Sequence, residues 1–334
     1  MVKATAAAKN FIIEGQDIQY TAPALLSSFS GRTTTMIHYD PHKWMDHFFD
    51  IRGSLVREIS TRVAVCLVWT TAIVVIHFHV RPLAVPSLLH SLVGLALGLL
   101  LVFRTNASYD RFWEGRKLWG GIVNETRNLI RGASVVLRGD RELLHELTRW
   151  TAIFPYAVAR GLRGQPGLGP LAAGPPDEVL ASVEGGQHAA LAVAVHMTDT
   201  LNRARERGLI SDILYASLDR NTHDLVGYLG GCERIRKTPL PFAYVVHLRR
   251  ALVLYCYTLP FALVSSYGWY TILDVLAVAY VFFGIEEIGV EIEGPFGNDD
   301  NDLPLDDICE TIHRNLYAVA GIETLPKESL PEGL

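Results

Sequence analysis

Residues 86–131 read PSLLHSLVGLALGLLLVFRTNASYDRFWEGRKLWGGIVNETRNLIR, and this stretch decides the fold. From Pro86 to Phe103 the few polar residues all lie near the start, whereas the segment from Arg104 onward is charged and aromatic. Pro86 suits the start of a helix because its missing N–H would have no partner there. The apolar part spans about 27 Å as a helix, close to the hydrocarbon thickness of a bilayer. We therefore predict one long helix that crosses a membrane and enters water at Arg104.

The composition favours a membrane protein. Of the 334 residues, 49% are hydrophobic and 19% are charged, a balance more apolar than soluble domains usually show. The formal net charge of −5 argues against nucleic-acid binding, because nucleic-acid binders usually carry a basic excess. The cysteines show no CxxC or Cys/His spacing, so we expect free thiols with no disulfide framework and no zinc site. They are Cys66, Cys232, Cys256 and Cys309.

Three further apolar runs predict an all-α chain with four transmembrane helices. They are Val63–Val80, about Ala251–Tyr267 and about Tyr270–Val290. The predicted organisation is a mobile N-terminal tail at 1–38, an interfacial helix and the first two spans at 39–103, a cytoplasmic helical region at 104–247, the third and fourth spans at 248–292, and a C-terminal cytoplasmic turn and helix at 293–334. Ser211 is expected to cap a helix within the cytoplasmic region.

The positions of lysine and arginine predict the orientation of the spans. Basic residues precede the first span, follow the second and precede the third, whereas the two short loops hold only Arg81. Basic flanks usually remain on the cytoplasmic side. We therefore expect a multi-pass protein of the plasma (inner) membrane with both termini in the cytoplasm.

Three carboxylates near the end of the fourth span raise an alternative function. Ionisable residues inside a membrane often mark functional sites, and the ExxxE spacing of Glu287 and Glu291 could hold a metal in a membrane enzyme. Glu286 lies beside them, yet no ExxH or second ExxxE lies on another span. No Ser/His/Asp set, P-loop or dinucleotide-binding motif is present either. We predict that the chain is not an enzyme, with a membrane enzyme or a proton-coupled transporter as the alternatives.

Three segments resemble the bestrophin family of ion channels, most closely its compact prokaryotic members. They are FRTNASYDRFWEGRKLWGGIVNETRNLIR at 103–131, GGCERIRKTPLPFAY at 230–244 and EGPFGNDDNDLPLDDICETIHRNL at 293–316. The similarity extends from about Trp44 to Gly321. It implies a homopentamer among membrane lipids, with one central pore for passive flow of small monovalent ions. The family suggests anions such as chloride, and cation selectivity remains an alternative.

The resemblance also implies two constrictions in this pore. Leu95, Leu99 and Phe103 match the three residues of a hydrophobic neck, and their i, i+4, i+8 spacing puts them on one helix face. Without the resemblance, such a stripe would more often face lipid or pack against another helix. Ile213 matches a second, cytoplasmic aperture. The adjacent Asp212 either caps its helix or, repeated five times, places negative charge beside the pore and favours cations.

An acidic run, residues 298–302, follows the turn at Pro295. Oxygen-rich clusters suit hard cations such as calcium. By resemblance to calcium-activated members, Asp299 and Asp302 match two carboxylate ligands, and Glu291 and Gly294 match two backbone carbonyl donors. The alternative is a solvated turn whose Asp and Asn side chains cap their own backbone. Calcium is the one cofactor that the sequence suggests.

Overall fold

The computed structural model describes residues 55–170 and 188–322. These residues all belong to the larger of two units into which the chain divides, Thr34–Leu334. Every regular element in the two described ranges is a helix, as the all-α prediction required. The predicted tail at 1–38 and most of the predicted interfacial helix lie outside the described residues.

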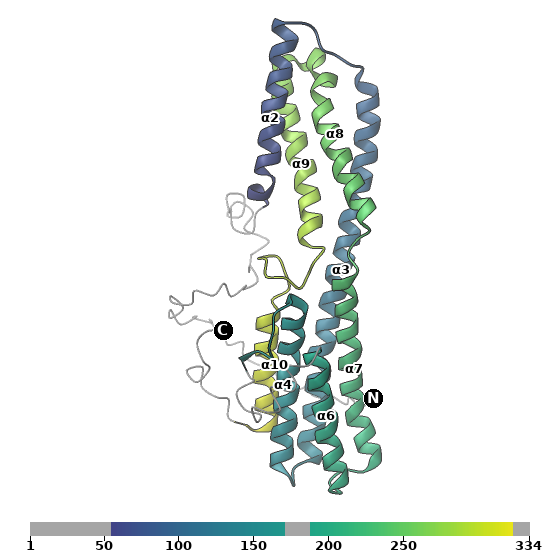
Figure 1. The fold of residues 1–334 in the computed structure, drawn as a ribbon, viewed down its shortest axis with the longest axis vertical. Coiled ribbons are helices and arrows are strands. Elements are labelled where there is room, and N and C mark those ends of the chain that lie inside the picture. The colour runs from purple at the N-terminus through teal and green to yellow at the C-terminus, as the bar shows by residue number, and fades with distance from the viewer. Residues whose placement is uncertain (1–54, 171–187, 323–334) are drawn as a thin grey trace, which may run out of the picture. The chain divides into compact units, whose positions relative to one another are not determined.

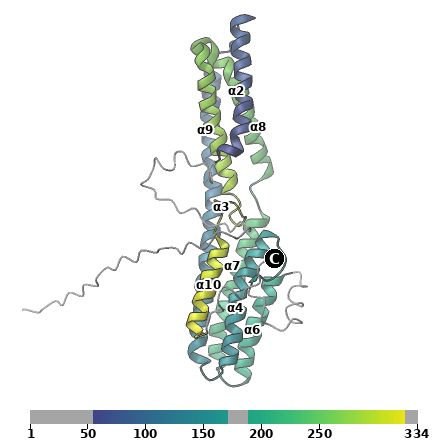
Figure 2. The ribbon, with the colours of Figure 1, turned by 90° about the vertical axis from the view of Figure 1, so that its left-hand side faces the viewer.

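Helix α3, Ser87–Val136, is the 50-residue helix expected from the opening stretch. At 1.5 Å per residue it is about 75 Å long, and it contributes to two separate hydrophobic clusters. Leu97 and Leu101 belong to the first cluster, whereas Trp119 and Ile130 belong to the second. Figures 1 and 2 show α3 passing through both groups of helices. A single helix therefore connects the apolar group with the mixed one.

The first group contains the N-terminal part of α3 together with α2, α8 and α9 (Figure 1). Their bounds are Val56–His79, Phe242–Tyr267 and Thr271–Glu291. Helices α2, α8 and α9 pack against one another, and α8 and α9 also pack against α3. In the described ranges, α2 and α3 are the helices long and apolar enough to cross a membrane. Helices α8 and α9 exceed 20 residues but contain charged residues, Arg249 and Arg250 in the first half of α8 and acidic residues near both ends of α9.

Two of these helices begin earlier than the sequence predicted. Helix α8 begins at Phe242 and not near Ala251, because Pro241 precedes the first turn and no later residue interrupts the helix. Helix α2 begins at Val56 and not at Val63, so part of the segment assigned to an interfacial helix is continuous with the first span. In both cases charged residues occupy helical positions that hydropathy alone excluded from the span.

The second group surrounds the C-terminal half of α3. Its helices α4, α6, α7 and α10 run over Arg141–Arg163, Ala189–Glu206, Asp212–Lys237 and Leu305–Ala320. Ser211 caps α7 as predicted, since its hydroxyl accepts the Leu214 N–H at 3.4 Å. A Cβ at Gly121 would lie 2.5 Å from the Tyr228 ring, so the glycine makes room for this ring where α7 packs against α3.

Candidate functional site

The three residues assigned to a pore neck lie on the unpacked face of α3. Leu95, Leu99 and Phe103 are 66%, 54% and 63% exposed. Leu97 and Leu101, both buried in the first cluster, lie about 200° around the helix from Leu95 and Leu99 respectively. The helix therefore packs with one side and presents an apolar stripe with the other.

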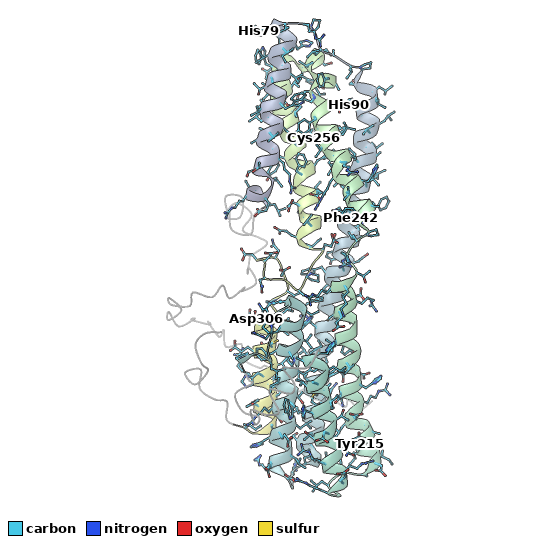
Figure 3. All side chains as sticks on the ribbon, in the orientation of Figure 1. His79, His90, Tyr215, Phe242, Cys256 and Asp306 are labelled. Atoms are coloured by element: carbon cyan, nitrogen blue, oxygen red, sulfur yellow. The ribbon has the colours of Figure 1, made fainter. Side chains whose placement is uncertain are left out.

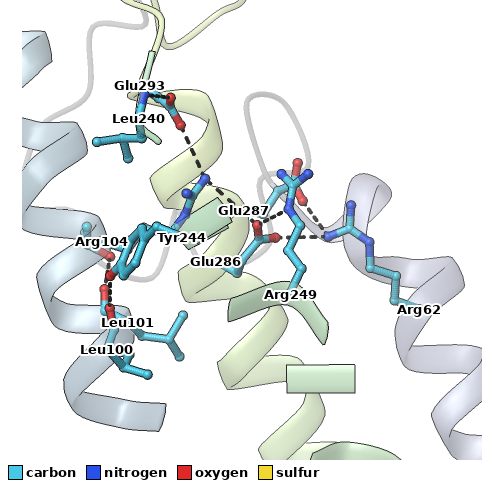
Figure 4. Close-up of polar contacts among 11 residues, drawn as sticks. Arg62, Leu100, Leu101, Arg104, Leu240, Tyr244, Arg249, Glu286, Glu287 and Glu293 are labelled. Carbon is cyan, nitrogen blue, oxygen red and sulfur yellow. Dashed lines mark hydrogen bonds and ion pairs between the residues drawn. The ribbon is translucent and has the colours of Figure 1, made fainter. Parts of the chain in front are cut away.

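Arg104 follows the last of these residues and points toward the packed side of α3. Its side chain is 1% exposed, and its Nη2 lies 3.4 Å from Glu293 Oε2 and 3.9 Å from Glu286 Oε1. Figure 4 shows these groups meeting between α3, α8 and α9. The exposed apolar stripe thus ends at Phe103, and the next residue, Arg104, makes a buried charged contact.

Glu286 is the most highly connected carboxylate of this junction. It is 2% exposed, and its two oxygens pair with Arg249 Nε at 2.7 Å and Arg62 Nη1 at 3.4 Å. Arg62 also pairs with Glu287 at 2.7 Å. Buried carboxylates need such partners because an isolated charge is costly to remove from water. Glu286 and Glu287 are therefore engaged in ion pairs, whereas the Glu291 carboxylate accepts from the Asn301 amide. The described residues contain no group of three or more His, Cys, Asp or Glu arranged to hold a metal.

A second set of contacts ties the ends of α7, α8 and α9 to α3. Arg111, two turns after Arg104, donates to the backbone carbonyls of Ile235 and Thr238 at 2.6 and 2.5 Å and to the Glu293 carbonyl at 3.2 Å. The Glu293 carboxylate accepts the Leu240 N–H at 3.0 Å. Arg111 therefore bonds α3 to the end of α7 and to the segment after α9, and Glu293 in turn holds the segment before α8.

Ile213, assigned to the cytoplasmic aperture, is 82% exposed in the first turn of α7. Asp212 precedes it and is paired with Arg205 of α6 at 3.7 Å. Arg205 also lies over the Tyr215 ring, 5.2 Å from its centroid. Asp212 thus has a basic partner in the single chain, and negative charge beside the pore at this position stays a prediction.

The acidic turn is closed by its own hydrogen bonds. Asp302 Oδ2 accepts the Asp299 N–H at 2.7 Å, and the Asn301 amide donates to the Glu291 carboxylate at 2.5 Å. Burial raises the pKa of Asp302 to about 6, with the Asp299 N–H opposing the shift. One of the two carboxylates suggested for the calcium site, that of Asp302, thus has an internal partner, as the alternative of a self-capping turn expects.

All four cysteines are buried and free, as predicted. The thiols of Cys66 on α2 and Cys256 on α8 are hydrogen-bonded to each other inside the first cluster. The other two lie in the second cluster. The thiols therefore serve as small apolar packing groups in the described structure.

Comparison with known proteins identifies the family. Residues 36–318 match the family described as Bacterial/Fungal Bestrophin protein. The chain belongs to the bestrophin family. A voltage-dependent anion channel-forming protein of Nostoc sp. is 41% identical over 282 residues, which cover 82% of this chain and 90% of the relative. A protein of the same description from Escherichia coli is 33% identical over 302 residues, covering 89% and 98%.

Solved structures support the same assignment to the bestrophin fold. A crystal structure of a bacterial bestrophin homolog from Klebsiella pneumoniae superposes with a TM-score of 0.76 at 30% identity, covering 80% of this chain and 100% of that chain. A crystal structure described as that of a membrane protein gives a TM-score of 0.76, also at 30% identity, covering 79% and 99%. The bestrophin resemblance inferred from three sequence segments is thereby confirmed, and the family is membrane-embedded.

Several residues of this bestrophin-family site were missed by the sequence analysis. Arg104, Arg111 and Glu293 occur within the quoted segments, but their roles depend on partners more than 100 positions away. For Arg205 the sequence holds a weak indication of its partner, because it lies only seven residues before Asp212 across a short connection between two helices. Pairing of residues on different helices could not be read from local spacing.

Proposed function

We propose that this bestrophin-family chain forms an ion channel that conducts small monovalent anions passively. One observation carries the proposal: α3 exposes Leu95, Leu99 and Phe103 on the side opposite its packed face. Channel-forming relatives from Nostoc and Escherichia coli are named for anions. The membrane-enzyme alternative lacks support, because Glu287 is ion-paired with Arg62 and the family indicates a channel.

We infer that the channel is a homopentamer in which five copies of α3 surround the pore. Repetition of the exposed stripe around a symmetry axis would turn each apolar side chain into a ring. An ion entering such a ring loses hydration water and gains no replacement ligand, so the ring can control conduction by dewetting. Ile213, equally unpacked at the start of α7, would form the second narrow point, the cytoplasmic aperture.

The membrane arrangement that we propose has four spans, α2, the first part of α3, α8 and α9. Arg62 and Arg249 meet the carboxylates of α9 close to Arg104, where the apolar part of α3 ends (Figure 4). Basic groups usually remain on the cytoplasmic side. We therefore assign the four spans to the inner membrane, and both termini and the second helical group to the cytoplasm.

A planar-bilayer recording of the purified protein under a KCl gradient tests the channel. We expect unitary currents whose reversal potential is shifted from zero toward the equilibrium potential of chloride, because the relatives are named as anion channels. Saturable, proton-dependent flux without unitary currents would contradict the proposal and favour a transporter. The membrane-enzyme alternative would be favoured if the protein in lipid vesicles showed no current but had a metal-dependent activity that requires Glu287.

We also propose that the acidic turn binds calcium with low affinity, through Asp299 and Asp302 carboxylates and the carbonyls of Glu291 and Gly294. The oxygen donors have the right chemistry for a hard cation. However, Asp302 already accepts the Asp299 N–H, and calcium would have to replace that bond. We therefore expect a dissociation constant of about 10⁻³ M, as in weak calcium modules.

Titration calorimetry at two pH values tests the calcium site. Because the pKa of Asp302 is raised to about 6, its carboxyl is mainly ionised at pH 7.5 and mainly protonated at pH 5. Cation binding needs the ionised form, so calcium heats should be measurable at pH 7.5 and fall as the pH drops through 6. Asp302→Asn should abolish them, whereas Asp306→Asn, an exposed aspartate paired with Arg163, should not. Absence of heat at pH 7.5 would contradict the site.

A further inference from the structure

The connection between α6 and α7 holds a compact group of three side chains. Arg205 lies in the last turn of α6, and Asp212 lies in the first turn of α7. The guanidinium of Arg205 is 3.7 Å from the Asp212 carboxylate and 5.2 Å from the Tyr215 ring centroid. Figure 3 places Tyr215 at the end of the second helical group away from Phe242, where α8 begins. The group therefore lies beside the exposed Ile213.

We propose that Arg205 determines the charge selectivity of the cytoplasmic aperture. It neutralises Asp212 next to Ile213, so that the ring of five isoleucines carries no unbalanced negative charge and admits anions. The inference rests on the proposed channel and its aperture at Ile213. It assigns a specificity-determining role to a residue on α6, outside the helix that carries the aperture itself.

The geometry holds Arg205 in the position that this role requires. An arginine over an aromatic face is attracted by the ring quadrupole, and a planar guanidinium suits simultaneous stacking and carboxylate pairing. Tyr215 follows Asp212 by three residues, so both partners lie on one face of α7. The arginine is therefore held between a ring and a carboxylate of the same helix turn.

The neighbouring arginines on this connection are committed to other partners. Arg203 pairs with Glu146 and with Asp199, and Arg207 pairs with Asp140 at 2.7 Å. Both therefore have nearer acidic partners than Asp212. The charge balance beside Ile213 consequently depends on Arg205.

Symmetry gives a modest surface contact a large effect on ion flow. A single exposed ion pair contributes little to stability, and the Asp212 side chain is 88% exposed. In a pentamer, however, five carboxylates would surround the same opening, and rings of acidic side chains select for cations in channels. Screening acts over about 8–10 Å at physiological salt, so five unpaired charges at a narrow opening would still act on a passing ion.

A double-mutant cycle in bilayers tests the role of Arg205. Reversal potentials are measured in a tenfold KCl gradient for wild type, Arg205→Gln, Asp212→Asn and the double variant. We expect Arg205→Gln to lower the chloride-over-potassium permeability ratio at least threefold and Asp212→Asn to raise it. The double variant should return close to wild type, because both charges are gone. Arg205→Lys should keep most of the anion preference.

Matched controls separate the outcomes. Arg207→Gln removes an equal charge from the same connection and should leave the permeability ratio unchanged, because its partner is Asp140. Size-exclusion profiles identical to wild type would show that each variant still assembles. If Arg205→Gln conducts with the wild-type permeability ratio, Arg205 does not have this role. The same holds if Arg205→Gln changes the ratio equally in the wild-type and Asp212→Asn backgrounds. Either result would leave the proposed channel intact. No current from wild type would overturn both.

Discussion

Leu99→Ala is expected to raise single-channel conductance about fivefold. Leu99 is the middle residue of the exposed stripe and is 54% exposed in the single chain. Five shorter side chains would widen the apolar ring and lower the cost of keeping it wet. A barrier lower by about 1 kcal/mol corresponds to roughly a fivefold faster passage. The measurement is unitary current at fixed voltage in symmetrical KCl.

Leu254→Ala provides the matched control for this experiment. It is the same substitution at a similarly exposed leucine, 66% exposed, but on α8, away from the proposed pore. Its unitary conductance should equal that of wild type. If Leu99→Ala and Leu254→Ala gave the same conductance as wild type, the apolar stripe of α3 would not be the neck.

Glu286→Gln is expected to destabilise the protein by about 3 kcal/mol. Glu286 compensates Arg249 at 2.7 Å, Arg62 at 3.4 Å and the buried Arg104 at 3.9 Å. Removing one partner of a buried ion pair typically costs about 3–5 kcal/mol, because it leaves an uncompensated buried charge. The lower value applies because Arg62 and Arg249 are about half exposed and remain partly hydrated. Thermal unfolding in a fixed detergent measures the loss.

Glu287→Gln makes the same chemical change one residue later and should cost about 1 kcal/mol or less. Glu287 pairs with Arg62, whose side chain is 43% exposed and can be solvated when the partner is lost. Glu287 is also buried, so the two variants differ in the number of arginine partners that lose their carboxylate. Equal melting temperatures would show that the additional partners of Glu286, Arg249 and Arg104, do not control stability. A conductance of Glu287→Gln equal to wild type would agree with a structural role for this carboxylate.

The sequence by itself determined the elements of this protein and its family. An unbroken apolar run followed by charged residues, without glycine or proline in a helix-breaking context, was sufficient for the 50-residue α3. The i, i+4, i+8 spacing placed Leu95, Leu99 and Phe103 on one face, and Ser211 marked the start of α7. These features depend on neighbours within about two helical turns, and such local information is present in the order of residues.

The tertiary structure alone decided which charges compensate one another. Arg62 and Glu287 are 225 positions apart, and Arg104 and Glu293 are 189 apart, so no spacing rule relates them. For the same reason hydropathy begins the first and third spans at Val63 and about Ala251, whereas the helices that contain them begin at Val56 and Phe242. Hydropathy treats each arginine as a free charge. Once packing brings α3, α8 and α9 together, the arginine charges are balanced and can lie within helices. The long helix was thus set by local sequence, whereas the direction that its apolar stripe faces was set by the ion pairs holding its other side.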